Sequence, residues 1–269
     1  MTELLTGLPL DGIGETLDMD IGRVHARTPR SDIHAHPVLV TAAVAVLGYA
    51  LLVVFGLLLG ALVTNFVVGH SLGKGDLDIA RWFAHRRTTT WNDLSLVGSY
   101  VAETVTVFVV LAIALAVLAW KRHWPQCGLL VATMAVEGGM YLATTYFVSR
   151  ERPAVPRLEH LIVSDSFPSG HTAAAVALYG SLAIVVWSLT REPVWRVLFL
   201  ALAVIAPIVV AVSRVYRGMH NPTDAIGGAL LGAACIAVGY VSVRAGLSAG
   251  RDGGAERWDE QRLRLEEAV

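Results

Sequence analysis

Charged residues are scarce in this chain: they make up 16% of its 269 residues, while 55% are hydrophobic. Because a soluble domain is usually about a quarter charged, this composition indicates a membrane protein. The net charge is only −1, and without a basic excess no nucleic-acid partner is expected. The two cysteines, Cys127 and Cys235, lie in apolar segments and offer neither a disulfide framework nor metal-ligand spacing.

The apolar residues are concentrated in six runs, each close to the roughly 20 residues that a membrane-spanning helix needs. They predict an all-α, polytopic membrane protein with a six-helix transmembrane bundle over residues 37–243. Residues 1–36 and 244–269 are predicted polar tails, and no cleavable signal peptide is expected in the first of them. The six runs are Pro37–Thr64, Tyr100–Trp120, Cys127–Val148, Gly170–Leu189, Val194–Val212 and Asp224–Val243.

A polar loop, Asn65–Ser99, separates the first two runs. Its middle, Asp76–Arg87, mixes acids and arginines with Trp82 and Phe83, which is typical of a short helix lying on the bilayer surface. An ordinary surface helix is an equally good interpretation.

Basic residues indicate the orientation. They collect before the first run and after the second, fourth and sixth runs, which predicts that these segments and both termini are cytoplasmic. These residues are Arg23, Arg27, Arg30, Lys121, Arg122, His123, Arg191, Arg196, Arg244, Arg251 and Arg257. The arginines predicted on the opposite face are clustered around three polar motifs, so we interpret them as site residues.

The three motifs stand at the ends of apolar runs. Arg150-Glu151-Arg152-Pro153 follows the third run, and Pro168-Ser169-Gly170-His171 opens the fourth. Ser213-Arg214 closes the fifth, and five residues later His220-Asn221-Pro222-Thr223-Asp224 opens the sixth. The stretch Thr172–Val212 is long enough for two crossings, so the second and third motifs return to one face.

The residue types in these motifs suit a phosphate group. Arginine presents a planar fork that grips phosphate oxygens, which makes Arg152 and Arg214 the expected clamps. Ser169 has the position of a helix N-cap, and Gly170 lets the backbone approach closely. A helix N-terminus with free N–H groups is itself an anion site.

The two histidines and the aspartate suit phosphoryl transfer. Asp224 lies in the first turn of the predicted sixth helix, where it can reach back to the His220 ring. A carboxylate on one ring nitrogen fixes the tautomer and leaves the other nitrogen free to attack. His171 is then expected to protonate the leaving oxygen as the general acid.

These motifs resemble those of the type 2 phosphatidic acid phosphatase superfamily, which also includes vanadium haloperoxidases. The family signature is K-x-x-x-x-x-x-R-P, then P-S-G-H, then S-R-x-x-x-x-x-H-x-x-x-D, and the last two elements match at every fixed position. The resemblance implies a phosphohistidine on His220, oriented by Asp224, with His171 as proton donor. It further implies a reaction without a metal or other cofactor, and phosphate binding by Arg152, Arg214, Ser169 and Gly170.

One signature position differs. The lysine of the first element falls at Thr145, which carries no charge. Arg150 lies nearby and is our first candidate for a replacement cation in the phosphate site, with Lys74 in the first outer loop as a weaker one. A lost cation in a dry phosphate site would weaken transition-state stabilisation.

We therefore predict an integral membrane phosphatase that acts on a lipid monoester or a polyprenyl diphosphate at the outer leaflet of a bacterial cell membrane. Its expected partners are the lipid phosphate substrate and membrane lipids. One alternative is a lipid phosphotransferase, in which an alcohol replaces water. Another is a catalytically impaired lipid-binding member, which the missing lysine suggests.

Overall fold

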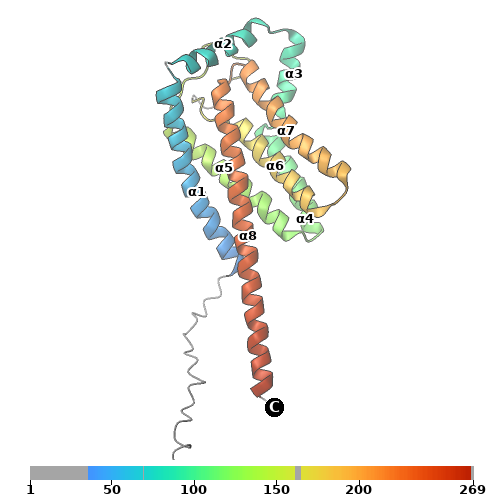
Figure 1. Cartoon of the computed structure of the whole chain (residues 1–269). Coiled ribbons are helices and arrows are strands. Elements are labelled where there is room, and N and C mark those ends of the chain that lie inside the picture. The colour runs from blue at the N-terminus through green and yellow to red at the C-terminus, as the bar shows by residue number, and fades with distance from the viewer. Residues whose placement is uncertain (1–35, 69, 161–164, 268–269) are drawn as a thin grey trace, which may run out of the picture. The chain divides into compact units, whose positions relative to one another are not determined.

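The computed structural model describes residues 36–68, 70–160 and 165–267, and these are helical apart from the connecting segments, of which the longest follows Phe147 (Figure 1). This confirms the predicted all-α class. The elements are α1 (Pro37–Leu62), the π-helical turn η1 (Val63–Val67), α2 (Ser71–His85), α3 (Thr89–Tyr100), α4 (Thr104–Trp120), α5 (Trp124–Phe147), α6 (Gly170–Leu189), α7 (Pro193–Tyr216) and α8 (Pro222–Glu267).

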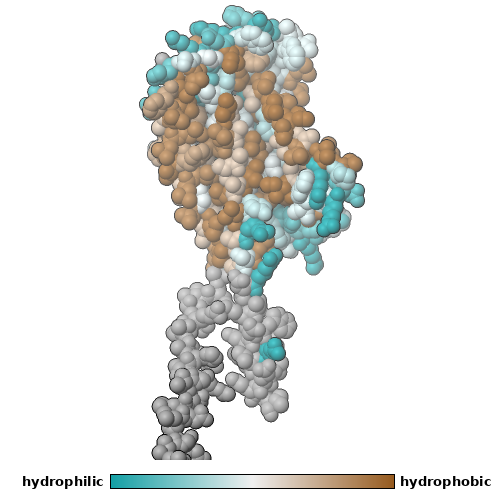
Figure 2. All heavy atoms as spheres, in the orientation of Figure 1, coloured by the Kyte–Doolittle hydropathy of each residue, from teal (hydrophilic) through white to brown (hydrophobic). Residues whose placement is uncertain are grey.

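Five helices are long and apolar enough to cross a membrane: α1 with η1, α5, α6, α7 and the first part of α8. A sixth crossing results if α3 and α4, which are bent by 44° at their junction, form one broken span. The chain is thus a multi-pass membrane protein. On the face shown in Figure 2, an apolar band covers the bundle between two hydrophilic ends.

The second crossing differs from the single run predicted over Tyr100–Trp120. The helix breaks after Tyr100, and a new helix starts where the carboxylate of Glu103 accepts a hydrogen bond of 2.9 Å from the Val105 amide. The Val101 carbonyl, freed by the break, accepts a 2.7 Å bond from the hydroxyl of Tyr179. A capping carboxylate inside an otherwise apolar run therefore marks the bend.

The loop between the first two crossings contains two helices, α2 and α3. The predicted helix over Asp76–Arg87 corresponds to α2, which begins five residues earlier, at Ser71. On α2, Leu72 and Trp82 are exposed, whereas Asp76 and Ala80 are buried. A buried aspartate on a surface segment is unexpected from the sequence.

The bundle is organised around α6 and α8. Helix α8 packs against α1, α5 and α6, and α6 also packs against α7. The approach of α8 to α6 is close, because a Cβ atom at Gly232 would lie 2.5 Å from the Ala173 carbonyl oxygen. Helix α8 continues to Glu267 rather than ending at Val243, so the predicted tail 244–269 is helical to that residue; of the N-terminal tail, residues 1–35 lie outside the described residues.

Candidate active site

Backbone hydrogen bonds tie the three motifs together. The Ser166 amide donates to the Arg150 carbonyl at 2.8 Å, which joins the segment after α5 to the segment before α6. The Ser169 amide donates to the Asp224 carbonyl at 3.1 Å, which joins the start of α6 to the start of α8. The chain therefore brings all three motifs to one end of the bundle, as the span lengths require.

His220 is buried just before α8, and its Nδ1 lies 2.8 Å from the Ser166 carbonyl oxygen. A carbonyl can only accept, so Nδ1 carries the hydrogen and Nε2 keeps its lone pair. Burial lowers the pKa of His220 well below its usual range, and the positive charges of Arg214 and Arg152 lower it further. The imidazole is therefore neutral near pH 7, in the form that can attack phosphorus.

Asp224 does not play its predicted part directly. It is fully buried, and its carboxylate accepts from Arg150, from the Ser166 hydroxyl, and from the Asn221 amide and side chain at 2.7 and 3.1 Å. The prediction that it bonds the His220 ring is wrong, because the Ser166 carbonyl occupies Nδ1. In the described residues, Asp224 is connected to the ring through Ser166 and through Asn221, the next residue after His220.

Arg150 also differs from the prediction. Its Nη2 lies 2.7 Å from the Asp76 carboxylate, and its Nη1 donates to Asp224 and, at 2.8 Å, to the Thr223 hydroxyl. Both carboxylates are buried, so the guanidinium is held between two anions. It is therefore not placed to bind phosphate, which is the role that we expected for it. Lys74, the second candidate, is exposed on α2.

Ser169 and Gly170 lie at the N-terminus of α6 as predicted for an anion site. Ser169 occupies the N-cap position, but its hydroxyl pairs with Thr172 at 3.0 Å instead of with a backbone amide. A Cβ atom at Gly170 would lie 2.6 Å from the Tyr141 ring, so glycine keeps this approach open. The first amides of α6 therefore remain available beside the partly buried His171.

The two predicted clamps surround this helix end in different ways. Arg152 donates to the backbone carbonyls of Met219 and Asp165, next to His220 and Ser166. Arg214 is buried and donates to the Ser99 hydroxyl at 2.8 Å and to the Glu159 carboxylate at 2.6 Å. Its Nε is buried and has no hydrogen-bond partner among the residues that the structure describes.

Glu159 occupies the anion position on Arg214. Its other oxygen accepts from the Nε of Arg217, so one carboxylate bridges two arginines. Burial acts to raise the pKa of Glu159, but the charges and hydrogen bonds of the two arginines outweigh it and hold that pKa below its usual range. The site thus already holds an anion, supplied by its own loop.

Sequence reasoning missed three residues of this site. Asp76 lies on α2, far from the motifs in sequence, and Ser166 and Glu159 lie in the loop between α5 and α6. None of the three belongs to a sequence motif with a recognisable spacing. The one available signal was the acidic residue at Asp76 in the amphipathic segment. Thr145, at the signature position, has its hydroxyl in the interior, where no described residue forms a hydrogen bond with it.

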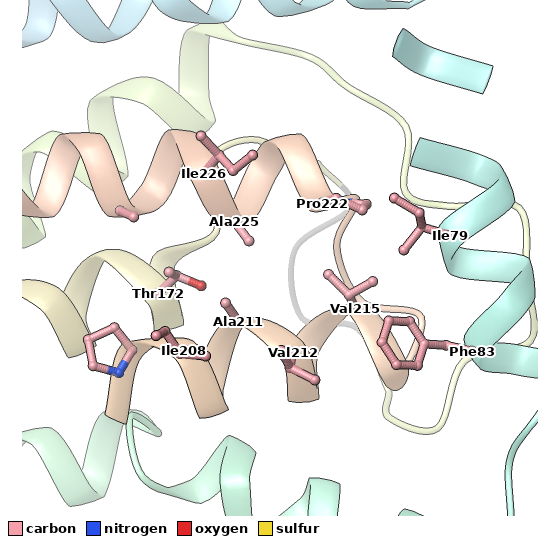
Figure 3. A pocket seen from close by; sticks show the side chains of 12 residues that line it. Ile79, Phe83, Thr172, Ile208, Ala211, Val212, Val215, Pro222, Ala225 and Ile226 are labelled. Carbon is pink, nitrogen blue, oxygen red and sulfur yellow. The ribbon is translucent and has the colours of Figure 1, made fainter. Parts of the chain in front are cut away.

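An apolar cavity of about 330 Å³ lies beside the start of α6. Figure 3 shows Ala211 and Val215 of α7 facing Ala225 of α8 across it, with Phe83 of α2 at one end. Thr172 is the polar residue of its lining, and the hydroxyl of Thr172 is the partner of Ser169. The cavity therefore adjoins the N-terminus of α6.

Comparison with known families and proteins agrees with the motifs. Residues 126–246 match the model of the PAP2 superfamily. Sphingosine-1-phosphate phosphatase 2 of Mus musculus is 37% identical over 89 residues, which are 33% of this chain and 25% of that protein. The bacitracin transport permease protein BcrC of Bacillus licheniformis is 35% identical over 80 residues, 30% of this chain and 34% of that protein. The matches thus span a quarter to a third of these relatives.

The fold is also similar to a solved structure. The first transmembrane PAP2 type phosphatidylglycerolphosphate phosphatase from Bacillus subtilis superposes with a TM-score of 0.59 at 23% identity. The superposition covers 73% of this chain and 94% of that one. At this identity the similarity concerns the fold, which is the helical arrangement described above.

Proposed function

Because residues 126–246 match the model of the PAP2 superfamily, we propose that the chain is a member of this superfamily and acts as a membrane lipid phosphatase. It removes phosphate from a lipid monoester or diphosphate through a phosphohistidine on His220, without a metal. The observation that carries the proposal is the neutral, buried imidazole of His220, with Nδ1 bound to a carbonyl and with Arg152 and Arg214 close enough to shift its pKa.

In the proposed mechanism, the phosphoryl oxygens replace Glu159 on Arg214 and bind the first amides of α6. Arg152 supplies the second positive charge. These groups are set before the reaction begins, which is the arrangement that stabilises charge developing in a transition state.

Nε2 of His220 then attacks phosphorus and forms an N–P bond while the bond to the lipid oxygen breaks. His171 gives that oxygen a proton, and the lipid alcohol leaves. In the second step His171 takes a proton from water, the hydroxide attacks phosphorus, and the N–P bond breaks to release inorganic phosphate.

The apolar cavity supports a lipid substrate. A hydrocarbon chain lying along Ala211 and Ala225 places its polar end near Thr172, beside the N-terminus of α6. Helix ends that meet head groups also suit such a substrate. By the distribution of basic residues, we propose that this end faces away from the cytoplasm of a bacterial cell.

The test is phosphate release by the purified protein in detergent, over a panel of lipid monophosphates and polyprenyl diphosphates. Wild-type protein should release phosphate from at least one of them and be inhibited by vanadate, which mimics pentavalent phosphorus. His220→Ala should abolish release, and His85→Ala, at an exposed histidine of α2, should not. Turnover by folded His220→Ala protein would refute the nucleophile.

A second test addresses the cavity. Ala211→Phe should raise KM for a long-chain lipid phosphate at least about tenfold and leave KM for a short soluble phosphate monoester unchanged. Val197→Phe, on the exposed face of α7, is the matched control. Equal changes in KM for both substrates would show that the cavity does not bind the lipid chain.

A further inference from the structure

Asp76 lies on α2, outside every motif, yet its carboxylate is directed into the end of the bundle. It is only 4% exposed. One oxygen accepts from the Thr223 amide at 3.1 Å, and the other from the Thr223 hydroxyl and from Arg150 Nη2 at 2.7 Å. Among the described residues, its hydrogen-bond partners are thus Thr223, three residues after His220, and Arg150, whose carbonyl accepts from the Ser166 amide.

Arg150 connects Asp76 to Asp224. A guanidinium is planar and rigid, so fixing one terminal nitrogen on Asp76 fixes the direction of the other. That other nitrogen, Nη1, donates to Asp224, whose side chain is fully buried. Because the two carboxylates share one guanidinium, neither can move without changing the other contact.

Asp224 connects the pair to the nucleophile. Its Oδ2 accepts from the Ser166 hydroxyl and from the Asn221 amide at 2.7 Å. Ser166 then places its carbonyl 2.8 Å from Nδ1 of His220, and Asn221 is the next residue in the chain. Four side chains therefore form a continuous path from α2 to the imidazole.

Asp76 is not itself bonded to the phosphate-binding groups in the described residues. Arg152, Arg214 and Ser169 share no hydrogen bond with Asp76 in the part of the chain that the structure describes. A change at Asp76 should therefore alter the aim of the imidazole while leaving phosphate binding intact.

We propose that Asp76 is a positioning residue for His220, acting through Arg150, Asp224 and Ser166, so that helix α2 is part of the catalytic apparatus. The proposal rests on the proposed function, because it takes His220 to be the nucleophile. The competing explanation is purely structural: Asp76 satisfies the first amide of α8 and stabilises the fold without affecting the ring.

The experiment compares Asp76→Asn with Asp78→Asn, an exposed aspartate two residues further along α2. We expect Asp76→Asn to lower kcat between about ten- and a hundredfold, the size of effect that misplacing a reacting group produces. KM and the inhibition constant of vanadate should stay within about twofold of wild type, and Asp78→Asn should match wild type.

Arg150→Gln tests the path itself. If Asp76 acts through Arg150, the double variant Asp76→Asn/Arg150→Gln should be no slower than Arg150→Gln alone, since residues acting as one unit are not additive. Independent, multiplying losses would overturn the path. An unchanged kcat in Asp76→Asn, or a raised KM at constant kcat, would overturn the proposal as a whole.

A replacement variant and an NMR measurement test the same proposal in other ways. If Asp76→Asn does not fold, Thr223→Val, which removes the hydroxyl shared by Asp76 and Arg150, takes its place. For that variant too, kcat should fall while KM stays unchanged.

The ¹⁵N chemical shifts of His220, assigned by comparison with His220→Gln, report the tautomer of the ring without any need for turnover. A single Nδ1–H tautomer should be lost in Asp76→Asn, and its retention would contradict the proposal even if the proposed substrates were wrong. Absence of phosphate release by wild type would instead contradict the proposed function.

Discussion

Arg150 and Arg214 are both arginines at helix ends of the same site, and both are paired with carboxylates, yet their surroundings are opposite. Arg150 bridges Asp76 and Asp224, whose side chains are 4% and 0% exposed. Arg214 holds Glu159, whose side chain is 24% exposed and lies in a loop. A buried carboxylate cannot leave its partner without a large desolvation penalty, whereas a partly exposed one can turn to water.

The comparison teaches which arginine is available to a substrate. Arg150 keeps its two buried carboxylates, so it contributes rigidity to the site. Arg214 can exchange the Glu159 carboxylate for a phosphate, so it can contribute affinity for the substrate. The comparison also bears on Thr145, which stands where the signature has a lysine. Arg150 does not replace that lysine as a phosphate-binding cation, because its charge is already paired with two carboxylates.

The largest expected effect is on stability. Arg150→Met leaves two buried carboxylates unpaired and should lower the free energy of unfolding by about 3–5 kcal/mol. Arg214→Met should lower it by only about 1 kcal/mol, because Glu159 keeps Arg217 as a partner. Denaturation of both variants in the same detergent measures the difference, and equal losses would break the distinction between the two arginines.

The next effect is on catalysis. Arg214→Gln should lower kcat/KM about 10²- to 10³-fold, the range found when one preorganised donor to transition-state charge is removed. Arg191→Gln, at an exposed arginine in the turn between α6 and α7, is the control for lost positive charge. Steady-state phosphate release gives both values, and a loss below about threefold would show that Arg214 does not hold phosphate.

A smaller effect concerns Glu159. Because its carboxylate competes with phosphate for Arg214, Glu159→Gln should lower KM about fivefold, equivalent to an ion pair of about 1 kcal/mol, with kcat nearly unchanged. Glu151→Gln, an exposed acid of the first motif, should leave KM as it is. A higher KM in Glu159→Gln would mean that the carboxylate helps to hold substrate instead of competing with it.

The last effect is on pH dependence. The pKa of His220 is lowered from 6.5 in the folded protein, so below pH 6.5 the unfolded chain binds a proton that the folded one does not. His220 therefore makes wild type lose stability as pH falls, by up to about 1.4 kcal/mol per unit. His220→Gln should lose less than wild type between pH 7.5 and 5.5 in thermal unfolding, and parallel losses would contradict a lowered pKa.

Much of the fold was predictable because it depends on local properties. The apolar runs are long enough to exclude other structures in a bilayer, and prolines at the first turns of α1, α5, α7 and α8 agree with their starts. The bend after Tyr100 and the length of α8 were missed. The first depends on the capping carboxylate of Glu103, and the second on a helix that continues past its apolar part.

The sequence by itself determined that this chain crosses a membrane several times. It also determined that the three motifs, with His171, His220 and Asp224, lie at one end, since run length and motif order require it. Only the tertiary structure decided which carboxylate each arginine meets. Asp76 and Arg150 are 74 residues apart, as are Arg150 and Asp224. Whether such groups touch depends on how the helices pack, and neither spacing nor residue type encodes that contact.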